Sequence, residues 1–488
     1  MIDPRSFLIA MPEIEVAFAG LFLLVVAAVC GKRETQRIGI LAIATFMLAI
    51  VTMFSGKRLG LMFDGLLPAY AFGNQFVDDG FARFAKAIVL GASGLSILLS
   101  WDYFKKEGQE RPEYPVLILF ATLGMMLMIS AGNLLALYVG IELQSLSLYV
   151  LAAFNRDQER SSEAGLKYFI LGALSSGIML YGISLIYGFA GTTDFESLMS
   201  SLRGAAPAPR GVVVGMVFVC AGLAFKLAGV PFHMWAPDVF EGAPTPVTAF
   251  FASAPKIAAL ALFTRFLLYP MYSLMNDWRQ VIVFISVASM AWGAFAGLMQ
   301  SNLKRLLAYS AIANAGTLLI GLIIGNSAGI QALLIYFVIY ALGTLGAFGV
   351  ILCLRRNGKP VEELIDLSGL SKKYPLVALA MAVLVFSLAG LPPLAGFFGK
   401  YFIFLAAVQA ELVPLAIIGV LTSVVAAFYY IRIVKVMYFD EPLHTLDPLP
   451  DWGVRTVVGL TSVAVVILAF APSPLVDSAL NAAKGFII

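Results

Sequence analysis

About fourteen long apolar segments, separated by short polar stretches, decide the fold class of this chain. A helix needs roughly 20 apolar residues to cross the hydrocarbon core of a membrane, and most segments are about that long. The segments cover residues 8–30, 37–56, 81–101, 114–131, 133–154, 164–189, 211–234, 245–269, 279–299, 304–325, 329–354, 375–406, 412–438 and 454–471. Only 12% of the residues are charged, against about 25% in soluble domains. The sequence therefore predicts an all-α polytopic membrane protein with about fourteen transmembrane helices.

The loops between the segments predict one membrane domain over residues 1–488. Most loops are short, so neighbouring helices should pack antiparallel. Two loops are longer. Residues 55–79 alternate apolar and Gly, Asp or Asn residues, which favours a small outer hairpin or loop. Residues 191–210 are rich in Ser, Ala and Pro, which favours an exposed connector.

Lysine and arginine are concentrated in the loops that follow odd-numbered segments, whereas the opposite loops are poorer in them. The rich loops contain Lys32, Arg33, Arg37, Lys105, Lys106, Arg111, Arg156, Arg160, Lys304, Arg305, Arg355, Arg356, Lys359, Lys372 and Lys373. Cytoplasmic loops carry this excess of positive charge. We therefore expect a multi-pass protein of the bacterial cytoplasmic (inner) membrane, with both termini on the outer, periplasmic side. Acidic residues precede the first apolar run, so we expect that span to be retained.

The composition argues against several classes of function. The net charge of +3 is too small to indicate nucleic-acid binding. The three cysteines form no CxxC pattern, and there are only two histidines. No haem pair, iron–sulfur pattern or phosphate-binding loop is present in the sequence. We therefore expect the chain to hold no redox centre, cofactor or metal of its own.

A short motif predicts that two of the helices are discontinuous. The sequence LAGVP at 227–231, in the seventh segment, recurs as LAGLP at 388–392 in the twelfth, where Pro393 follows. Proline removes a hydrogen-bond donor and frees the carbonyl four residues before it, here Leu227 and Leu388. The two segments run in opposite directions, and paired broken helices in oppositely oriented halves are typical of inverted-repeat transporters. A polar turn is expected after the first break.

Four charged residues lie inside apolar segments: Glu142 in the fifth, Lys226 in the seventh, Lys256 in the eighth and Lys400 in the twelfth. A charge at the centre of a membrane helix costs about 2.5–3.5 kcal/mol or more, so such residues indicate function. The alternatives are a neutral Glu142 bonded to nearby Gln and Ser side chains, and lysines that reach the interface. The second alternative suits the lysines poorly, because apolar residues continue on both sides of them.

One carboxylate and several lysines in the membrane favour a proton relay bridged by water. A buried lysine changes its protonation state readily, and if Glu142 meets Lys226, the carboxylate would hold the lysine charged. Lys167 and His233 are secondary candidates, although Lys167 could reach the interface and His233 could be interfacial. Weaker candidates that could assist the path or hold water are Tyr309, Arg265, Ser175, Ser176 and Asn314, each of which could equally pack between helices.

At these residues the sequence resembles the N subunit of proton-pumping NADH:quinone oxidoreductase, respiratory complex I. The stretches that carry the resemblance are VPFHMWAPDVFEGAPTPVTAFFASAPKIA, GIELQSLSLYVL and LAGLPPLAGFFGK. The resemblance implies an antiporter-like fold with two inverted five-helix repeats. We accordingly divide the chain into residues 1–110, 111–270 (first repeat), 271–440 (second repeat) and 441–488.

The resemblance also implies functional positions that match Glu142, Lys226, Lys256 and Lys400, with Lys167 and His233 as further ones. No long lateral helix follows the last segment, unlike in the L subunit, and Lys400 departs from the glutamate of the M subunit. The expected function is proton translocation coupled to electron transfer from NADH to quinone in other subunits, where NADH, FMN, iron–sulfur clusters and quinone would bind. Expected partners are the other membrane subunits, especially the other antiporter-like ones, and indirectly the peripheral redox arm. The alternatives are a subunit of a multi-subunit Na⁺/H⁺ antiporter and a structural membrane scaffold.

Overall fold

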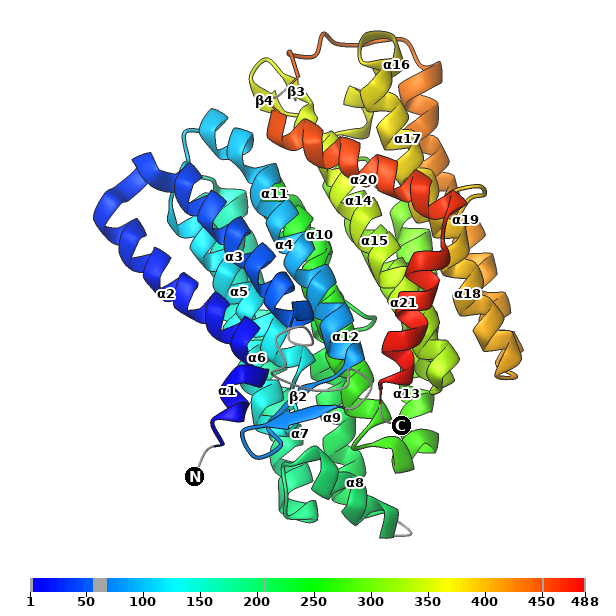
Figure 1. Ribbon diagram of the computed structural model, residues 1–488. Helices are drawn as coiled ribbons and strands as arrows, with labels where there is room; N and C mark the ends of the chain where they lie inside the picture. The colour runs from blue at the N-terminus through cyan, green and yellow to red at the C-terminus, as the bar shows by residue number, and fades with distance from the viewer. Residues whose placement is uncertain (1–2, 56–67, 205–207, 450–451, 487–488) are drawn as a thin grey trace.

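The computed structural model describes residues 3–55, 68–204, 208–449 and 452–486, which form a bundle of helices with two short β-hairpins (Figure 1). The α-helices are α1 (Arg5–Ile9), α2 (Met11–Cys30), α3 (Thr35–Ser55), α4 (Gly80–Lys106), α5 (Glu113–Ile129), α6 (Leu134–Ala152), α7 (Glu159–Ala190), α8 (Phe195–Gly204), α9 (Arg210–Leu227), α10 (Trp235–Gly242), α11 (Thr245–Ala252), α12 (Ala254–Leu268), α13 (Met275–Leu298), α14 (Leu303–Ile324), α15 (Ser327–Cys353), α16 (Leu370–Lys373), α17 (Pro375–Ala389), α18 (Ala395–Gln409), α19 (Val413–Phe439), α20 (Trp452–Phe470) and α21 (Ser473–Lys484). The 3-10 helices are η1 (Gly31–Glu34), η2 (Tyr272–Leu274) and η3 (Leu364–Leu367). The strands pair antiparallel, β1 (Ala69–Ala71) with β2 (Phe76–Asp78) and β3 (Arg355–Arg356) with β4 (Lys359–Pro360).

The helices account for all the predicted membrane crossings. Within the described residues, 12 helices are long and apolar enough to span a membrane, with α11 and α12 counted together. The shorter apolar helix α5 and the α17–α18 pair supply the other two predicted crossings. The prediction of an all-α polytopic membrane protein is confirmed.

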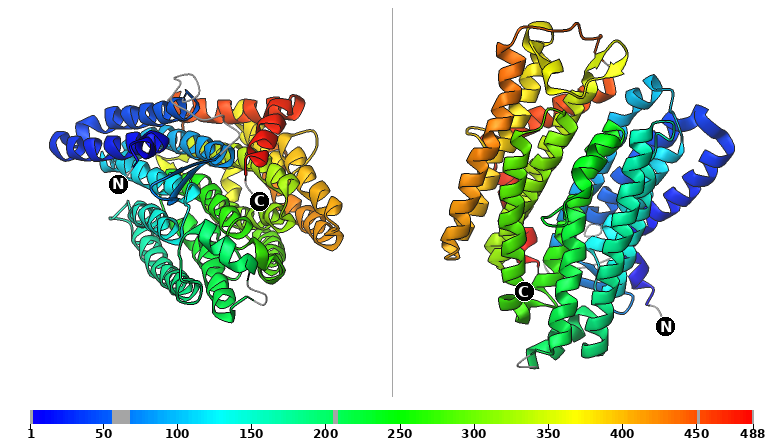
Figure 2. Two further views of the ribbon diagram at one scale, coloured as in Figure 1. Left: turned by 60° about the horizontal axis from the view of Figure 1, so that its bottom comes forward. Right: turned by 180° about the vertical axis from the view of Figure 1, so that it is seen from behind.

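The centre of the bundle is formed by α11, α12, α14 and α15. The most apolar stretch of α11–α12 is 100% buried, whereas the corresponding stretches of α2 and α19 are 28% buried. The N-terminal helices (blue) and α17–α19 (yellow to orange) lie on opposite sides of this centre (Figure 2). A helix that is apolar all round and fully buried within the protein can carry polar residues shielded from lipid.

Short side chains fix the helix starts and crossings that position the site. Asn133 begins α6 by accepting a hydrogen bond from Ala136 N at 2.6 Å, a typical N-cap. A Cβ atom on Gly124 of α5 would lie 2.5 Å from the backbone of Gln144 on α6. A Cβ atom on Gly182 of α7 would similarly lie 2.6 Å from the carbonyl oxygen of Gly215 on α9. Glycine is required at both crossings, because only it permits the backbones to approach so closely.

Both predicted helix breaks are present. α9 ends at Leu227, followed by Ala228 in the left-handed conformation (φ 58°), and the chain resumes as α10. α17 ends at Ala389, followed by Gly390 (φ 83°), and α18 continues the crossing. The Val230–Pro231 and Pro392–Pro393 peptide bonds are cis.

Three local predictions need correction. A turn does follow the first break, over residues 231–234, but it is short and leads into the largely buried helix α10, because Trp235, Val239 and Phe240 pack into the core. The eighth segment, predicted to be continuous, is interrupted at Ser253, two residues before Pro255, which cannot donate a helical hydrogen bond.

The connector 191–210 contains α8, an amphipathic helix with Phe195, Leu198 and Leu202 buried against the bundle. The other long loop forms the predicted hairpin over 69–78, and residues 56–67 of that loop lie outside the described residues.

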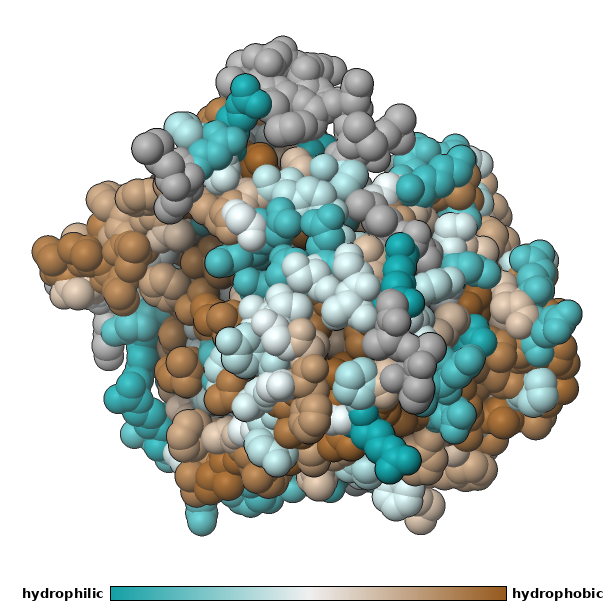
Figure 3. Space-filling view, turned by 90° about the horizontal axis from the view of Figure 1, so that it is seen from below, coloured by the Kyte–Doolittle hydropathy of each residue, from teal (hydrophilic) through white to brown (hydrophobic). Residues whose placement is uncertain are grey.

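The two ends of the bundle differ. Both chain termini are at one end, and η1, the β3–β4 hairpin and α16, with their basic residues, are at the other (Figure 1). Seen from the end with the termini, hydrophilic and near-neutral residues occupy much of the centre, with hydrophobic residues around parts of the rim (Figure 3). This distribution fits a protein whose sides face lipid and whose ends face water.

Candidate functional site

Glu142 lies in the middle of α6, with its side chain half-buried. Its oxygen Oε1 is shielded from solvent and has no hydrogen-bond partner among the described residues. The hydroxyls of Ser145 and Ser147 donate to carbonyls of their own helix, at 2.6 and 3.1 Å. The alternative of a neutral acid held by these serines therefore finds no supporting contact.

Lys226 is buried in the last turn of α9 and joins α6 through two hydroxyls. Its Nζ donates to Ser145 Oγ at 2.7 Å and to Tyr149 OH at 3.4 Å. Lys226 and Glu142 form no ion pair in the described structure, so the condition under which Glu142 would hold Lys226 charged, a direct meeting of the two side chains, is not met here. Ser145 is three residues, about one helical turn, from Glu142. The carboxylate and the amine thus approach the same stretch of α6 without touching.

At the break after Lys226, side chains from two other elements form hydrogen bonds with the backbone. The indole Nε1 of Trp235, in α10, donates to the carbonyl of Phe225 at 2.9 Å. Ser289 Oγ, in α13, accepts a hydrogen bond from Val230 N at 2.9 Å. Interrupted helices in a membrane persist where such partners satisfy the backbone. Trp235 therefore holds the two halves of the broken helix together beside Lys226.

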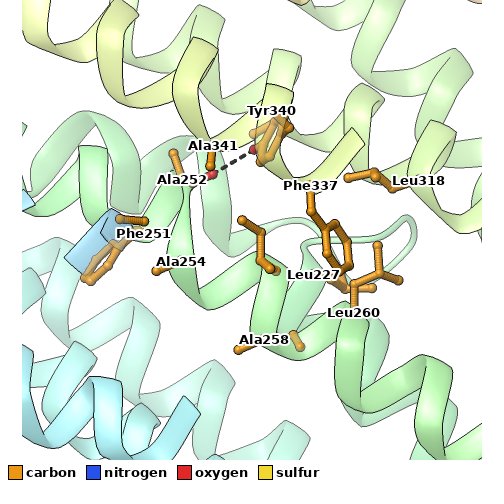
Figure 4. Packing of buried hydrophobic residues seen from close by; sticks show 14 of the residues in the cluster. Leu227, Phe251, Ala252, Ala254, Ala258, Leu260, Leu318, Phe337, Tyr340 and Ala341 are labelled. Carbon is orange, nitrogen blue, oxygen red and sulfur yellow. Dashed lines mark hydrogen bonds between the residues drawn. The ribbon is translucent and has the colours of Figure 1, made fainter. Parts of the chain in front are cut away.

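Lys256 lies in the first turn of α12, directly after the break at Ser253, and is 4% exposed. Its Nζ has no hydrogen-bond partner in the part of the chain that the structure describes. The centroid of the Phe240 ring is 5.6 Å from this nitrogen. The Lys256 side chain also lines a small cavity with wholly apolar walls, together with Leu227, Ile257, Leu260, Ala311, Ala315, Leu318 and Tyr340. Figure 4 shows part of this region, where Tyr340 OH donates to the carbonyl of Ala252 at 2.7 Å.

Lys400 is buried in α18 and contacts the second helix break directly. Its Nζ donates to the carbonyl of Ala389 at 3.0 Å, where α17 ends, and to Ser423 Oγ of α19 at 3.4 Å. A carbonyl freed by the interrupted helix is thus a ligand of the amine. Lys226 precedes its break and Lys400 follows its own, so the two lysines differ in their relation to the repeated motif.

A cluster of polar side chains is centred on α14. This helix packs on α12, which carries Lys256, and on α18, which carries Lys400. We call this set of side chains the hydroxyl cluster. It consists of Ser310 and Asn314 of α14, Tyr336 of α15 and Tyr430 of α19. Sequence analysis identified only Asn314. The signal for Ser310 and Tyr336 was the spacing of four residues within Ser310/Asn314 and Tyr336/Tyr340, which puts each pair on one helix face.

His233 lies within the first break and is partly exposed. Its ring packs edge-on against Trp292 of α13, with ring centroids 5.6 Å apart, and Trp292 is 52% exposed. No hydrogen bond joins His233 to Lys226 or Lys256 among the described residues. The structure therefore places His233 near the side of the bundle and not in contact with the buried lysines.

Lys167 belongs to a charged cluster at the end of the bundle opposite the termini. Its Nζ forms ion pairs with Glu163 at 2.7 Å and with Asp238 of α10 at 3.0 Å. Asp238 also binds Arg305 of α14 at 2.7 Å, and Arg305 reaches Glu241 at 3.0 Å. The Lys167 side chain is 43% exposed. This cluster ties α7, α10 and α14 together at a surface hollow.

Other buried cations are paired. Lys86 binds Glu13 at 2.6 Å and Lys304 binds Glu362 at 2.8 Å. Arg265, a weak candidate for the path, binds Asp79 through both guanidinium nitrogens, at 2.8 and 2.9 Å. It is nine residues from Lys256 on α12, about 13 Å along the helix, which places it apart from the other candidates. Sequence analysis missed the Glu13–Lys86 and Lys304–Glu362 pairs, because their partners are far apart in the chain.

The arrangement suits proton transfer. An amine gains and releases a proton, and hydroxyls can both donate and accept a hydrogen bond. α9 packs on α12, α12 on α14 and α14 on α18, so the elements that carry the lysines form a continuous succession. In the described residues, no group of three or more His, Cys, Asp or Glu side chains is arranged to hold a metal ion.

Known proteins share this sequence and fold. Residues 131–426 match the family described as NADH:quinone oxidoreductase/Mrp antiporter, TM. NADH-quinone oxidoreductase subunit N of Rhodospirillum rubrum is 52% identical over 475 residues, which cover 97% of this chain and 96% of the relative. A chain in the structure of respiratory complex I from Thermus thermophilus with bound aureothin is 32% identical, with a TM-score of 0.80, over 96% of this chain and 98% of that one.

A chain of the Mrp complex from a Dietzia species superposes with a TM-score of 0.84, over 99% of this chain and 97% of that one. It is only 22% identical, so it shows the shared fold alone. The match to the family over 131–426 and the 52% identity across nearly the whole length agree with each other. The chain belongs to the NADH:quinone oxidoreductase/Mrp antiporter membrane family and, within it, to the NADH-quinone oxidoreductase subunit N group.

Proposed function

We propose that this chain translocates protons as a membrane subunit of NADH:quinone oxidoreductase, through a relay that contains Glu142, Lys226, Lys256 and Lys400. Lys226 would exchange protons on the side of α6 and Lys256 would carry them to the second half of the bundle. Lys400 would load or release the outgoing proton. Electron transfer from NADH to quinone would take place in other subunits, which would hold FMN, the iron–sulfur clusters and the quinone.

The observation that carries the proposal is the contrast among the buried lysines. Five lysines are buried in the described structure, namely Lys86, Lys226, Lys256, Lys304 and Lys400. Lys86 and Lys304 form ion pairs with carboxylates, whereas the three relay lysines contact only hydroxyls, a carbonyl or no polar group. A buried cation without a counter-ion is costly and tends to lose its charge. Such amines are suited to change protonation state during a cycle.

The proposed setting follows from the charged loops and the comparisons. The end of the bundle that carries the β3–β4 hairpin and α16 would face the bacterial cytoplasm, with both termini on the periplasmic side. The relatives' names support membership in a multi-subunit complex. Within it we propose contact with other membrane subunits, among them further antiporter-like ones, and indirect contact with a peripheral redox arm. We also propose residues 111–270 and 271–440 as the two inverted repeats, with 1–110 and 441–488 outside them.

Lys167 and His233 are secondary members in this proposal. The ion pair of Lys167 with Asp238 suits a role in holding α10 at the cytoplasmic end of the path. The exposure of His233 beside Trp292 suits a role at the periphery of the broken helix. The two rival functions, a Na⁺/H⁺ antiporter subunit and a scaffold, share this fold, but no contact in the described residues favours either of them.

Purification of the native complex from membranes, followed by pumping assays of variants, tests the proposal. We expect the chain to copurify with flavin and iron–sulfur subunits, which an antiporter subunit would lack. In proteoliposomes, Lys400→Ala should lower proton uptake and coupled turnover while oxidation of NADH by an artificial acceptor is unchanged. Unchanged pumping by an assembled Lys400→Ala complex would exclude Lys400 from the path, and unchanged pumping by Lys226→Ala and Lys256→Ala as well would favour a scaffold.

A further inference from the structure

A cavity of about 90 Å³ lies where α3, α5 and α20 pack on α4, at the end of the bundle opposite the chain termini (Figure 1). One water molecule needs only about 10–15 Å³ of such space, so the cavity can hold a group of several non-hydrogen atoms. None of its lining residues belongs to the proposed relay. Those that matter for its chemistry are Trp101, Asp102, Lys105, Glu110, Tyr114 and Trp452.

Tyr114 supplies a buried hydroxyl to this cavity. The residue is 2% exposed, and its ring is fixed by edge-on contacts with Phe104 and Phe154, at centroid distances of 4.7 and 5.5 Å. Its OH has no hydrogen-bond partner among the described residues. Buried polar groups are nearly always satisfied by a hydrogen-bond partner. An unpaired hydroxyl on the wall of a cavity larger than one water molecule therefore marks a position for a hydrogen-bonding atom of a ligand.

Two indole rings in contact with each other also line the cavity. Trp101 of α4 is half-buried and Trp452 of α20 is 58% exposed, and their ring centroids are 5.8 Å apart with the planes inclined by 70°. Tryptophan is enriched where the hydrocarbon core of a membrane meets the lipid head groups. The face of an indole ring also attracts an ammonium group. The two rings therefore place the cavity at head-group depth and suit a ligand with a cationic group.

One apolar face of α4 leads from this cavity towards the middle of the membrane. Gly91, Leu95 and Leu98 follow one another at intervals of four and three residues, which places them on one helix face, and Trp101 continues the series. Gly91 is exposed and the two leucines are partly exposed. The ten residues from Gly91 to Trp101 span about 15 Å, which is half of the roughly 30 Å hydrocarbon core. This face therefore has the length and polarity to hold the acyl chains of a lipid in one leaflet.

The charged groups that line the cavity have both signs, because Asp102 and Glu110 supply carboxylates and Lys105 supplies an ammonium group. A purely anionic head group would be repelled by the two carboxylates. We propose that this cavity binds the head group of a phospholipid with a primary amine, of the phosphatidylethanolamine class. The amine of the lipid lies between the indoles and the carboxylates, and the phosphate oxygens accept hydrogen bonds from Lys105 and Tyr114. This inference goes beyond the proposed function and does not depend on the relay.

The test is photo-crosslinking in the whole purified complex, in lipid nanodiscs that contain a trace of phosphatidylethanolamine with a diazirine on one acyl chain. We expect labelling of α4 over residues 91–105. Competition by unlabelled lipids should give a relative affinity for phosphatidylethanolamine at least about tenfold above that for phosphatidylcholine or phosphatidylglycerol, because only a primary ammonium donates hydrogen bonds to the carboxylates. Equal affinities would show general contact with the bilayer and would overturn the proposal. Equally effective competition by free phosphoethanolamine would also overturn it, because the site would then take a soluble phosphate ester.

Variants of the lining residues locate the lipid in the cavity. Trp452→Ala should lower the relative affinity for phosphatidylethanolamine about fivefold to tenfold, because one indole face for the ammonium is lost. Glu110→Gln should reduce the preference over phosphatidylcholine, whereas Tyr114→Phe should weaken both lipids alike, because its hydroxyl binds the phosphate that they share. The matched control is Phe470→Ala, which removes an exposed aromatic ring at the other end of α20 and should bind lipid as the parent does.

The outcomes of these variants are independent of proton pumping. If assembled Trp452→Ala and Glu110→Gln complexes keep the lipid preference of the parent, the cavity is not the lipid site and the proposal is wrong, while the proposed function stands. The Lys400→Ala complex should keep the parent's lipid preference whether or not it pumps, because Lys400 does not line this cavity.

Discussion

Two regions of this membrane protein bury cations in opposite ways. Near the N-terminal helices, Lys86 of α4 is 2% exposed and lies 2.6 Å from Glu13 of α2, so each charge has a counter-ion. At the centre of the bundle, Lys256 is 4% exposed and its amine contacts no polar group among the described residues. Burial is nearly equal at the two sites. The two lysines differ in that Lys86 has a carboxylate partner and Lys256 has none among the described residues.

The difference separates fixed charges from charges that can change. A buried ion pair with both partners present is retained as a unit, because removing one partner leaves an uncompensated charge. An amine without a counter-ion gains nothing from staying charged in a dry site, so its proton is easily released. Paired cations therefore hold helices together, and unpaired ones are available for proton transfer.

The largest expected effect on stability is that of Lys86→Met. It leaves the carboxylate of Glu13 buried and alone, which should cost about 3–5 kcal/mol. We expect less of the chain in assembled complexes and a lower melting temperature of the purified complex. The double variant Glu13→Leu/Lys86→Met should recover most of the loss, since replacing a whole buried pair by apolar side chains is often neutral. A single variant as stable as the parent would contradict a structural role for the pair.

The same substitution at the unpaired site should act in the opposite way. Lys256→Met removes an amine that has no partner, so stability should stay the same or rise by about 1–3 kcal/mol. Coupled turnover should fall at least about tenfold, because a proton-exchanging group is lost from the path. Both quantities are measured on the same preparation, by thermal unfolding and by proton uptake in proteoliposomes. Loss of stability together with normal pumping would reverse the comparison.

Lys226 is intermediate, because hydroxyls and not a carboxylate hold its amine. Arginine keeps the positive charge but does not release its proton, so Lys226→Arg should assemble and pump poorly. Glu142→Gln should have a smaller effect, since Glu142 does not contact Lys226 in the described structure. Proton uptake per NADH oxidised measures both. Normal pumping by Lys226→Arg would make this lysine an electrostatic anchor only.

Sequence patterns predicted the elements of this fold well, because each depends on neighbours in the chain. The apolar runs predicted the crossings, and the motif at 227–231 and 388–392 predicted both breaks. The break at Ser253 was missed because the apolar run continues across it, although Pro255 in the interior of the predicted segment 245–269 was a signal for an interruption. Helix α10 was missed, because the polar residues Asp238 and Glu241 interrupt its apolar pattern, although its other face packs Phe240 into the core.

The contacts of the site could not be predicted in the same way. Burial of the lysines followed from their apolar neighbours, but the absence of a partner at Lys256 depends on how distant helices pack. The sequence left open whether Glu142 meets Lys226 for this reason, and in the structure α6 presents Ser145 and Tyr149 to Lys226 and not the carboxylate. The hydroxyl cluster likewise draws on three helices, and its residues are 120 positions apart at the Ser310–Tyr430 hydrogen bond.

The smallest effect is expected at Lys167, which is a paired lysine at the protein surface and not in the core. Its side chain is 43% exposed, and exposed ion pairs contribute only about 0.2–1 kcal/mol. Asp238 keeps its 2.7 Å contact with Arg305 when Lys167 is removed, so α10 stays attached to α14. Lys167→Ala should therefore lower the melting temperature slightly and change pumping little. Asp238→Ala removes the shared partner of both cations, so it should cost more than Lys167→Ala under the same conditions. Equal effects of the two changes would mean that the contact between Asp238 and Arg305 adds no stability, because Arg305 still reaches Glu241 of α10.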